Sequence, residues 1–360
     1  MANDKRFITL ARIPRNPGTE QREMEPFNVI VTKYLRLKRG DSVILKPNLT
    51  APWYVPGTCT TKYVLKNMCK VLKDHSCRIT ICEGDGGNAS YSALEAFHGN
   101  KLTDMAADYG VNFVSLSLLN RRKITQTVGN KSITFDLPNI LIERAFSYFI
   151  NIPVLKVHVY TLLSLSMKNL WGCIPDPFRI HYHRILHRGI VALWKTIRPD
   201  LSIIDGLIAG DGNGPINTEP IPMNLLIAGA EDATIDRVGT SILGVRFERV
   251  KHLILAEREH LIQPWKNIEL SESIEPFMKR VFRAERRISN WGMIMMSQVP
   301  LIQKIAYHSW ASAYTNRALR ALRKNNIQNE LRKYGDPAWG EGCGPSEFVY
   351  MGEGRKRNLW

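Results

Sequence analysis

Residues 151–187 read NIPVLKVHVYTLLSLSMKNLWGCIPDPFRIHYHRILH, and they set cationic side chains between apolar segments. The apolar run over 148–153 predicts a buried strand that leads to Lys156 and His158. A segment rich in Leu and Ser follows and carries Lys168. Four of the nine histidines fall within this tenth of the chain. Such a concentration of amines and imidazoles predicts a ligand-binding segment, with the rest of the chain as its scaffold.

Lys168 is the central candidate within this segment. If residues 161–170 are helical, Ser164 and Lys168 lie one turn apart on one face. The surrounding leucines would desolvate the lysine, and desolvation lowers the pKa of an amine, which makes it a nucleophile or a Schiff-base former. The alternative is a lysine that extends to solvent or pairs with a carboxylate such as Asp205. Asn169 and His158 beside it favour the functional interpretation.

The histidines of the segment offer acid/base or metal chemistry. His158 and His183 are predicted to move protons or to ligate a metal ion. His187 lies four residues after His183, a spacing that lets two imidazoles share a metal, although a packing role is the alternative for His187. The chain has no HExxH sequence, which excludes the zinc-protease class that uses it.

An alternation of strand and helix patterns precedes the segment. Strands are predicted over 6–12, 42–46, 78–82, 111–115 and 147–152, and helices over 27–35, 61–74 and 91–109. This order is typical of an α/β protein with a mainly parallel sheet and helices on both faces. A helix over 184–197 and strands over 201–205 and 224–228 continue it. Asp232 is predicted to cap a helix that runs to Leu243.

Polar side chains follow several of these strands, and a glycine-rich loop is predicted over 206–215. Open α/β sheets bind ligands where their strands end and the loops diverge. Asp205 is therefore predicted to orient the basic groups of a catalytic site, and Glu83 and Asp85 to lie beside it. The predicted cofactor- or substrate-binding residues are Lys46, Asn48, Lys156, Asn169, Gly212, Gly214 and Asp236.

The net charge of +16 is unevenly distributed. Residues 275–333 hold twelve Lys and Arg against three acids. We expect an α/β domain over 1–250, a basic helical region over 251–335 and a tail rich in Gly and Pro over 336–360. The basic helices 275–334 could dock an anionic membrane surface or an acidic protein. Nucleic acid is not an expected partner, because no nucleic-acid-binding module accompanies the charge.

Composition also constrains location and cofactors. The N-terminus is charged and has no apolar core of a signal peptide, and apolar runs are too short to span a bilayer. A cytoplasmic location is expected, peripheral to a membrane if the basic region docks there. The six cysteines form no CxxC pair, so neither an iron–sulfur cluster nor a zinc knuckle is expected.

The motifs resemble the domain of unknown function 362 family over about residues 40–245. The resemblance is carried by Lys46-Pro47-Asn48, Glu83-Gly84, the lysine–histidine–lysine–asparagine block over 153–172, Asp205-Gly206 and Asp232-x-x-x-Asp236. Many members also carry cysteine-rich ferredoxin segments, and this chain does not. The resemblance implies a fold and a site rather than a reaction.

The order His158, Lys168, His183 is also similar to that in the nickel-pincer lactate racemase group. That resemblance implies that Lys168 holds a cofactor, and that His158 and His183 ligate metal or move protons. We therefore expect a Lys/His-centred enzyme of racemase, isomerase or redox type that acts on a small anionic or hydroxylated substrate. A divalent metal or a nickel-type organometallic cofactor is the candidate cofactor. The alternative is a non-catalytic protein that docks through its basic helices.

Overall fold

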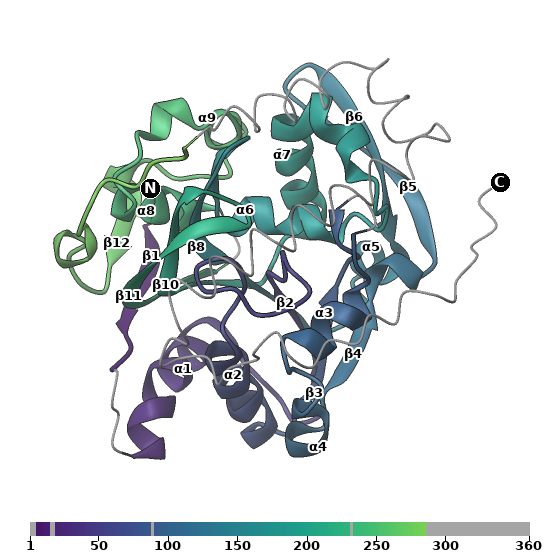
Figure 1. Ribbon diagram of the computed structural model, residues 1–360, viewed down its shortest axis with the longest axis vertical. Coiled ribbons are helices and arrows are strands. Elements are labelled where there is room, and N and C mark those ends of the chain that lie inside the picture. Colours follow the sequence, from purple (N-terminus) through teal and green to yellow (C-terminus); the bar gives the residue numbers. More distant parts are fainter. Residues whose placement is uncertain (1–4, 15–18, 88–89, 231–232, 286–360) are drawn as a thin grey trace.

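A ten-stranded sheet forms the centre of the computed structural model, which describes residues 5–14, 19–87, 90–230 and 233–285 (Figure 1). In spatial order the strands of its main path are β12 (Ile268–Leu270), β1 (Arg6–Arg12), β11 (Asn217–Ala230), β10 (Leu201–Asn213), β7 (Tyr148–Ile152), β2 (Ser42–Pro47), β3 (Arg78–Glu83) and β4 (Asn112–Ser115). Off this path, β8 (Val154–His158) pairs with β10, and β9 (Leu162–Ser164) pairs with β8.

Most strand pairs in this sheet are parallel. The pairs from β10 through β7, β2 and β3 to β4 all run parallel, as do β8 with β10 and β1 with β12. The antiparallel pairs are β1 with β11, β10 with β11, and β8 with β9. The prediction of a mainly parallel α/β sheet is confirmed.

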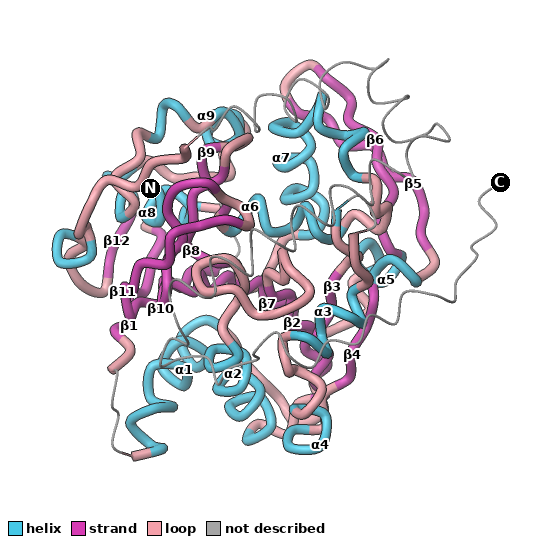
Figure 2. Tube along the Cα trace, in the orientation of Figure 1, coloured by secondary structure: helices cyan, strands magenta, loops and turns pink. Residues whose placement is uncertain are grey.

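Helices cover both faces of the sheet, because successive strand residues point to opposite sides. Val43 and Leu45 pack in a core with α1 (Glu20–Tyr34), α2 (Lys62–Asp74), α3 (Ala93–Gly99) and α4 (Met105–Tyr109). Ile44 packs in a second core with α7 (Leu186–Ile197), α8 (Thr234–Ile242) and α9 (Lys251–Arg258). The short helices α5 (Asn139–Glu143) and α6 (Ser166–Asn169) complete the set. Figure 2 shows the two groups of helices separated by the strands.

Local signals fix where the helices on the first face begin. The Thr19 and Thr61 side chains accept hydrogen bonds from the amides of Arg22 and Val64, which caps α1 and α2. Such side chains satisfy amides that have no partner in the first turn of a helix. The predicted cap Asp232 lies outside the described residues.

The predicted glycine-rich loop over 206–215 is largely strand. β10 continues to Asn213 and forms a long antiparallel hairpin with β11, which begins at Asn217 rather than at Asn224. The glycines here permit close packing. A Cβ at Gly210 would collide with the Gly57 carbonyl oxygen and would lie 2.9 Å from the Lys156 Cβ. The glycine content therefore reflects contact with neighbouring chain and not a loop.

The predicted helix over 161–170 is wrong in its first half. Leu162–Ser164 form strand β9, antiparallel to β8, and helix begins only at Ser166. Leu162 has φ +66°, which turns the chain back along β8. Ser164 and Lys168 consequently do not share a helix face.

A separate hairpin and the residues after 250 complete the described structure. Strands β5 (Arg121–Val128) and β6 (Lys131–Pro138) pair with each other and pack against α7. Beyond residue 250, α9 packs against α7 and β12 pairs with β1, so residues 251–285 adjoin the sheet. Residues 286–335 of the predicted basic helices and the tail over 336–360 lie outside the described residues. No helix in the described part of the chain is long and apolar enough to cross a bilayer.

Candidate functional site

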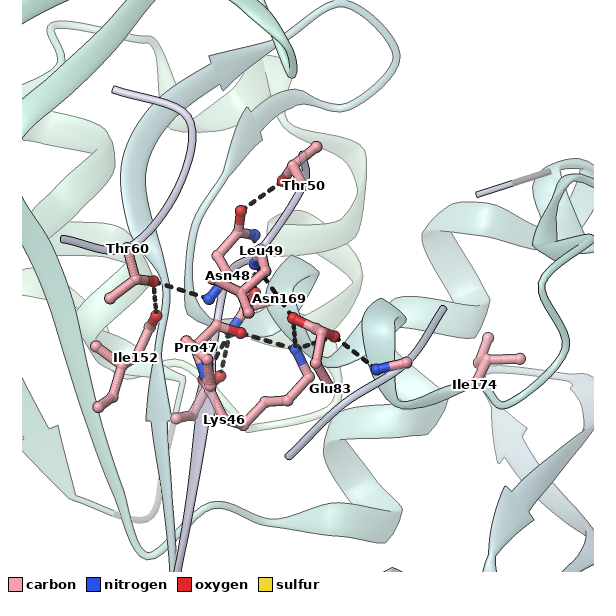
Figure 3. A network of polar contacts seen from close by, with 12 residues as sticks. Lys46, Pro47, Asn48, Leu49, Thr50, Thr60, Glu83, Ile152, Asn169 and Ile174 are labelled. Atoms are coloured by element: carbon pink, nitrogen blue, oxygen red, sulfur yellow. Dashed lines mark hydrogen bonds and ion pairs between the residues drawn. The ribbon is translucent and has the colours of Figure 1, made fainter. Parts of the chain in front are cut away.

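The site is built on strand ends. β2 and β3 are parallel neighbours, so their last residues, Lys46–Pro47 and Glu83, lie at the same edge. The Lys46 Nζ lies 2.7 Å from Glu83 Oε1 and donates to the Pro47 carbonyl, and both side chains are buried (Figure 3). A Cβ at Gly172 would lie 2.8 Å from that carboxylate and 3.0 Å from Nζ. Glycine at 172 therefore lets the segment after α6 rest on the ion pair.

A chain of amide side chains links β2 to α6 and β7. Asn48 Nδ2 donates to Asn169 Oδ1 at 2.8 Å, and Asn169 Nδ2 donates to Asn151 Oδ1 at 2.8 Å. Asn151 in turn donates to Ser166. Figure 3 shows Asn48 and Asn169 side by side above Lys46. The predicted binding residues Asn48 and Asn169 are thus brought together, and their amides fix the orientation of α6.

Lys156 is fully buried, and protein oxygens accept from its ammonium. Nζ donates to Asn48 Oδ1 at 2.9 Å, to Thr50 Oγ1 at 3.0 Å and to the Thr58 carbonyl at 2.6 Å. Burial lowers the pKa of Lys156 to about 8. Since an ammonium has three donors, this lysine has none left for a ligand. It positions Asn48 instead.

Lys168 differs from the two buried lysines. Its side chain is half-buried, and it makes no hydrogen bond or ion pair within the described part of the chain. Its Nζ lies 5.7 Å from the centre of the Trp171 ring. Desolvation, followed by the positive charges of Arg179, Lys156 and Lys46, lowers the pKa of Lys168 to about 7. A large fraction of this amine is therefore neutral and nucleophilic at physiological pH.

Lys168 interacts electrostatically with the imidazoles of His158 and His183. The His158 Nδ1 accepts from the Tyr160 amide at 3.1 Å, and the Tyr160 ring meets His158 and His183 edge-on at 5.8 and 5.1 Å. Burial, with Lys168 as the largest charged contributor, lowers the pKa of His158 well below its usual value and that of His183 to about 3. Both rings are neutral at pH 7, so each can accept or relay a proton.

His158 and His183 are also predicted to ligate a metal ion. Tyr160 contacts both rings. The described residues contain no group of three or more His, Cys, Asp or Glu placed to hold one metal ion. The metal role of these histidines, and the divalent metal or organometallic cofactor, stay predictions.

The predicted carboxylates organise the scaffold. Asp205 accepts from the Thr61 amide at 2.7 Å, from the Thr61 hydroxyl and from the Leu207 amide. Asp236 accepts from the Ser166 amide at 2.8 Å and the Met167 amide at 2.9 Å, which caps α6. Burial raises the pKa of Asp205 to about 6 and that of Asp236 to about 7. Asp236 thus fixes the start of the helix that carries Lys168.

Gly212 and Gly214 were predicted to bind a cofactor or substrate, and they lie at the end of β10 and in the turn that follows it. Gly212 lies on β10, and the Gly214 carbonyl accepts from the Val159 amide, next to His158. A binding role for either glycine stays a prediction. His252 on α9 was not predicted, yet its ring stacks on His187 at 5.9 Å. Only its position in an otherwise apolar stretch, HLILA, could have signalled it.

Comparison with known sequences places these residues in a wider group. The pattern of the family described as Domain of unknown function (DUF362) matches residues 43–241, more than half of the chain. A thylakoid-associated protein from Synechocystis sp. is 29% identical over 160 residues, which are 38% of this chain and 50% of that protein. The chain therefore spans about half the length of this curated relative. No solved structure matches the chain.

Proposed function

This chain belongs to the domain of unknown function 362 family, and we propose that it is an enzyme whose central group is Lys168. The observation that carries the proposal is the contrast among three lysines. Lys46 and Lys156 donate to protein oxygens, whereas Lys168 has no acceptor within the described residues. An amine held beside neutral imidazoles and left without a partner is suited to react with a substrate.

The substrate class follows from charge. Arg179 is buried, and its guanidinium donates to the carbonyls of Ile174 and Asp85 rather than to a carboxylate. Lys156 is likewise held by neutral oxygens. These uncompensated cations favour a small anionic substrate.

The reaction supported best begins with the neutral amine of Lys168. Its lone pair adds to a substrate carbonyl carbon, and loss of water leaves an imine, C=N. Both N–H protons of the amine end on the oxygen, which departs as water. His158 or His183 relays them in turn, the first when the carbon–nitrogen bond forms and the second when the carbon–oxygen bond breaks. An imine so formed would acidify the adjacent C–H bond, which suits an isomerase or racemase reaction.

Reductive trapping tests this proposal. Native protein incubated with glyoxylate and borohydride at pH 7.5 should gain the mass of one reduced adduct, located on Lys168. Lys168→Ala should lose the adduct while remaining folded by circular dichroism. Lys66→Ala, which removes an exposed lysine on α2, is the matched control and should keep it. Equal labelling of native protein and Lys168→Ala would contradict the proposal.

Protein purified without oxygen gives an independent check on a resident cofactor. Intact mass would reveal a group attached to Lys168, and metal analysis would reveal a bound ion. A covalent adduct on Lys168 in the purified protein would replace the imine by a cofactor-anchoring role for the same residue.

A second candidate function is docking to an anionic membrane through the basic region. Met278 and Val281 are 44% and 59% exposed and alternate with the exposed Lys279, Arg280 and Arg283. The thylakoid-associated relative also favours it. The expected result is co-sedimentation with vesicles containing phosphatidylglycerol that weakens at high salt and in Lys279→Glu/Arg283→Glu. Lys66→Glu is the control, and equal binding to neutral vesicles would contradict this function.

A further inference from the structure

Two histidines outside the predicted catalytic pair extend the group around Lys168. His187 on α7 and His252 on α9 stack with ring centres 5.9 Å apart and planes 14° apart. Burial lowers the pKa of both rings, and electrostatic interactions contribute further, with Lys251 and Lys168 for His187, and with His187 and Lys168 for His252. Together with His158 and His183 they form what we call the imidazole cluster.

Several nitrogen atoms of this cluster have no hydrogen-bond partner among the residues that the structure describes. Within the described residues, neither ring nitrogen of His252 has a hydrogen-bond partner, and the His252 side chain is 1% exposed. The Nδ1 atoms of His183 and His187 are also buried without a partner. A neutral imidazole carries one N–H donor and one acceptor, so His252 holds an unused donor whichever tautomer it adopts. Leaving such a group unpaired costs about 1–3 kcal/mol, which indicates a site for a ligand.

The surrounding charges select the kind of ligand. The lysines and arginines that lower the pKa of these rings are Lys251 and Lys168 for His187, Lys168 for His252, and Lys168 and Arg179 for His183. All are cations. A metal ion would be repelled here, whereas an oxyanion would be attracted and could accept from imidazole N–H groups and from an N–H of the Lys168 amine.

We propose that His187, His252 and Lys168 bind an oxyanion, the carboxylate or phosphate group of a small ligand. Lys168 and His187 are half-buried, so the ligand can approach from solvent, and His252 forms the buried end of the subsite. The assignment of this oxyanion to a substrate rests on the function proposed above. It places the anionic group on the α7–α9 side of Lys168 and the reacting carbon on the side of His158.

Titration of the full chain with simple anions tests the subsite. Native protein labelled with ¹⁵N-histidine is titrated with inorganic phosphate and, separately, with acetate, while the imidazole resonances are followed. We expect saturable shifts of His187 and His252, and the tighter anion identifies the headgroup. His187→Gln and His252→Gln should each weaken binding at least tenfold. His98→Gln, which changes an exposed histidine on α3, should leave it unchanged.

Because His252 is buried, the half-buried His187→Gln is the deciding variant, with circular dichroism to confirm its fold. Unchanged affinity for both anions in His187→Gln would overturn the proposal, and so would saturable binding of Zn²⁺ that displaces phosphate. Trapping of Lys168 by neutral acetaldehyde separates the two proposals. If His187→Gln is trapped normally by acetaldehyde but loses its preference for glyoxylate, both proposals stand. If anion binding depends on His187 but Lys168 is not trapped, the oxyanion subsite is supported and the imine reaction is contradicted.

Discussion

The buried ion pair between Lys46 and Glu83 should contribute strongly to the stability of the fold. Both side chains are buried, and the Glu83 carboxylate also accepts from the amides of Leu49 and Gly84. Glu83→Gln leaves a buried ammonium without a counter-charge, which should lower the free energy of unfolding by about 3–5 kcal/mol. Urea denaturation measures it. Lys46→Met combined with Glu83→Gln should destabilise less than the sum of the single changes, and strict additivity would contradict a coupled pair.

The imidazole cluster should make the stability of the fold decrease at acidic pH. Its pKa values are lowered, to about 3 for His183 and about 4 for His187, so folding favours the neutral rings. The stability they contribute is complete above pH 6.5 and is lost as pH falls through the folded-state values. Asp236, with its pKa raised to about 7, acts in the opposite sense and gains stability as pH falls.

Comparing His183→Gln with native protein separates the effect of histidine protonation on stability from the effect of Asp236. His183→Gln should lose less thermal stability than native protein between pH 6.5 and 4, because one protonation has been removed. His98→Gln should follow the native curve, since His98 is exposed. Melting temperatures across this range provide the measurement, and parallel curves for native protein and His183→Gln would refute the linkage.

Single residues also mark what a sequence can and cannot predict about the site. Lys46, Asn48, Lys156 and Asn169 follow predicted strands or a motif, and parallel strand ends must meet. The hydrogen bonds from Lys156 Nζ to Thr50 and Thr58 could not be predicted from the sequence. These threonines lie in a loop, and no periodic pattern of residues determines its path. His252 lies far along the chain on a helix that packs on α7, and tertiary packing alone brings it to His187.

The segment after α6 packs closely against the ends of β2 and β3, and a substitution at Gly172 tests this contact. A Cβ at Gly172 would lie 2.8 Å from Glu83 Oε1 and 3.0 Å from Lys46 Nζ, closer than van der Waals contact allows. Gly172→Ala should therefore destabilise the protein by about 1–3 kcal/mol and disturb the segment next to Lys168. Gly87→Ala is the matched control, because a Cβ there meets nothing within 4 Å. Equal unfolding midpoints for the two variants would be inconsistent with this close contact.

Two elements escaped sequence prediction for different physical reasons. The run TLLSLSMKNL has apolar residues compatible with a helix, but β9 is only three residues long and is held by pairing with β8. The glycines over 206–215 have the composition of a loop, whereas they allow the β10–β11 hairpin to approach Gly57 and Val157. The pairing of β9 with its neighbour β8, and the approach of the hairpin to Gly57, outweighed the local preferences.

At the scale of the whole molecule, the residues after 250 complete the sheet and its second core. β12 pairs with β1, and Leu253, Phe277 and Phe282 are buried. A chain that ends at residue 250 should therefore be far less stable, or insoluble, compared with one that ends at residue 285. Expression yield and thermal unfolding of the two chains provide the comparison. Equal stability would show that α9 and β12 contribute nothing to the α/β body.

The position of β1 in the sheet has a consequence for the order of events during synthesis. β1 leaves the ribosome before the other strands described here, yet its partners are β11, which begins at Asn217, and β12, which begins at Ile268. At about 5–20 residues per second, β1 waits on the order of ten seconds or more for a partner. The parallel unit from β2 to β4 can form in that interval. Residues 6–12 stay without a strand partner until β11 has been made, so we expect their pairing to follow the formation of the unit from β2 to β4.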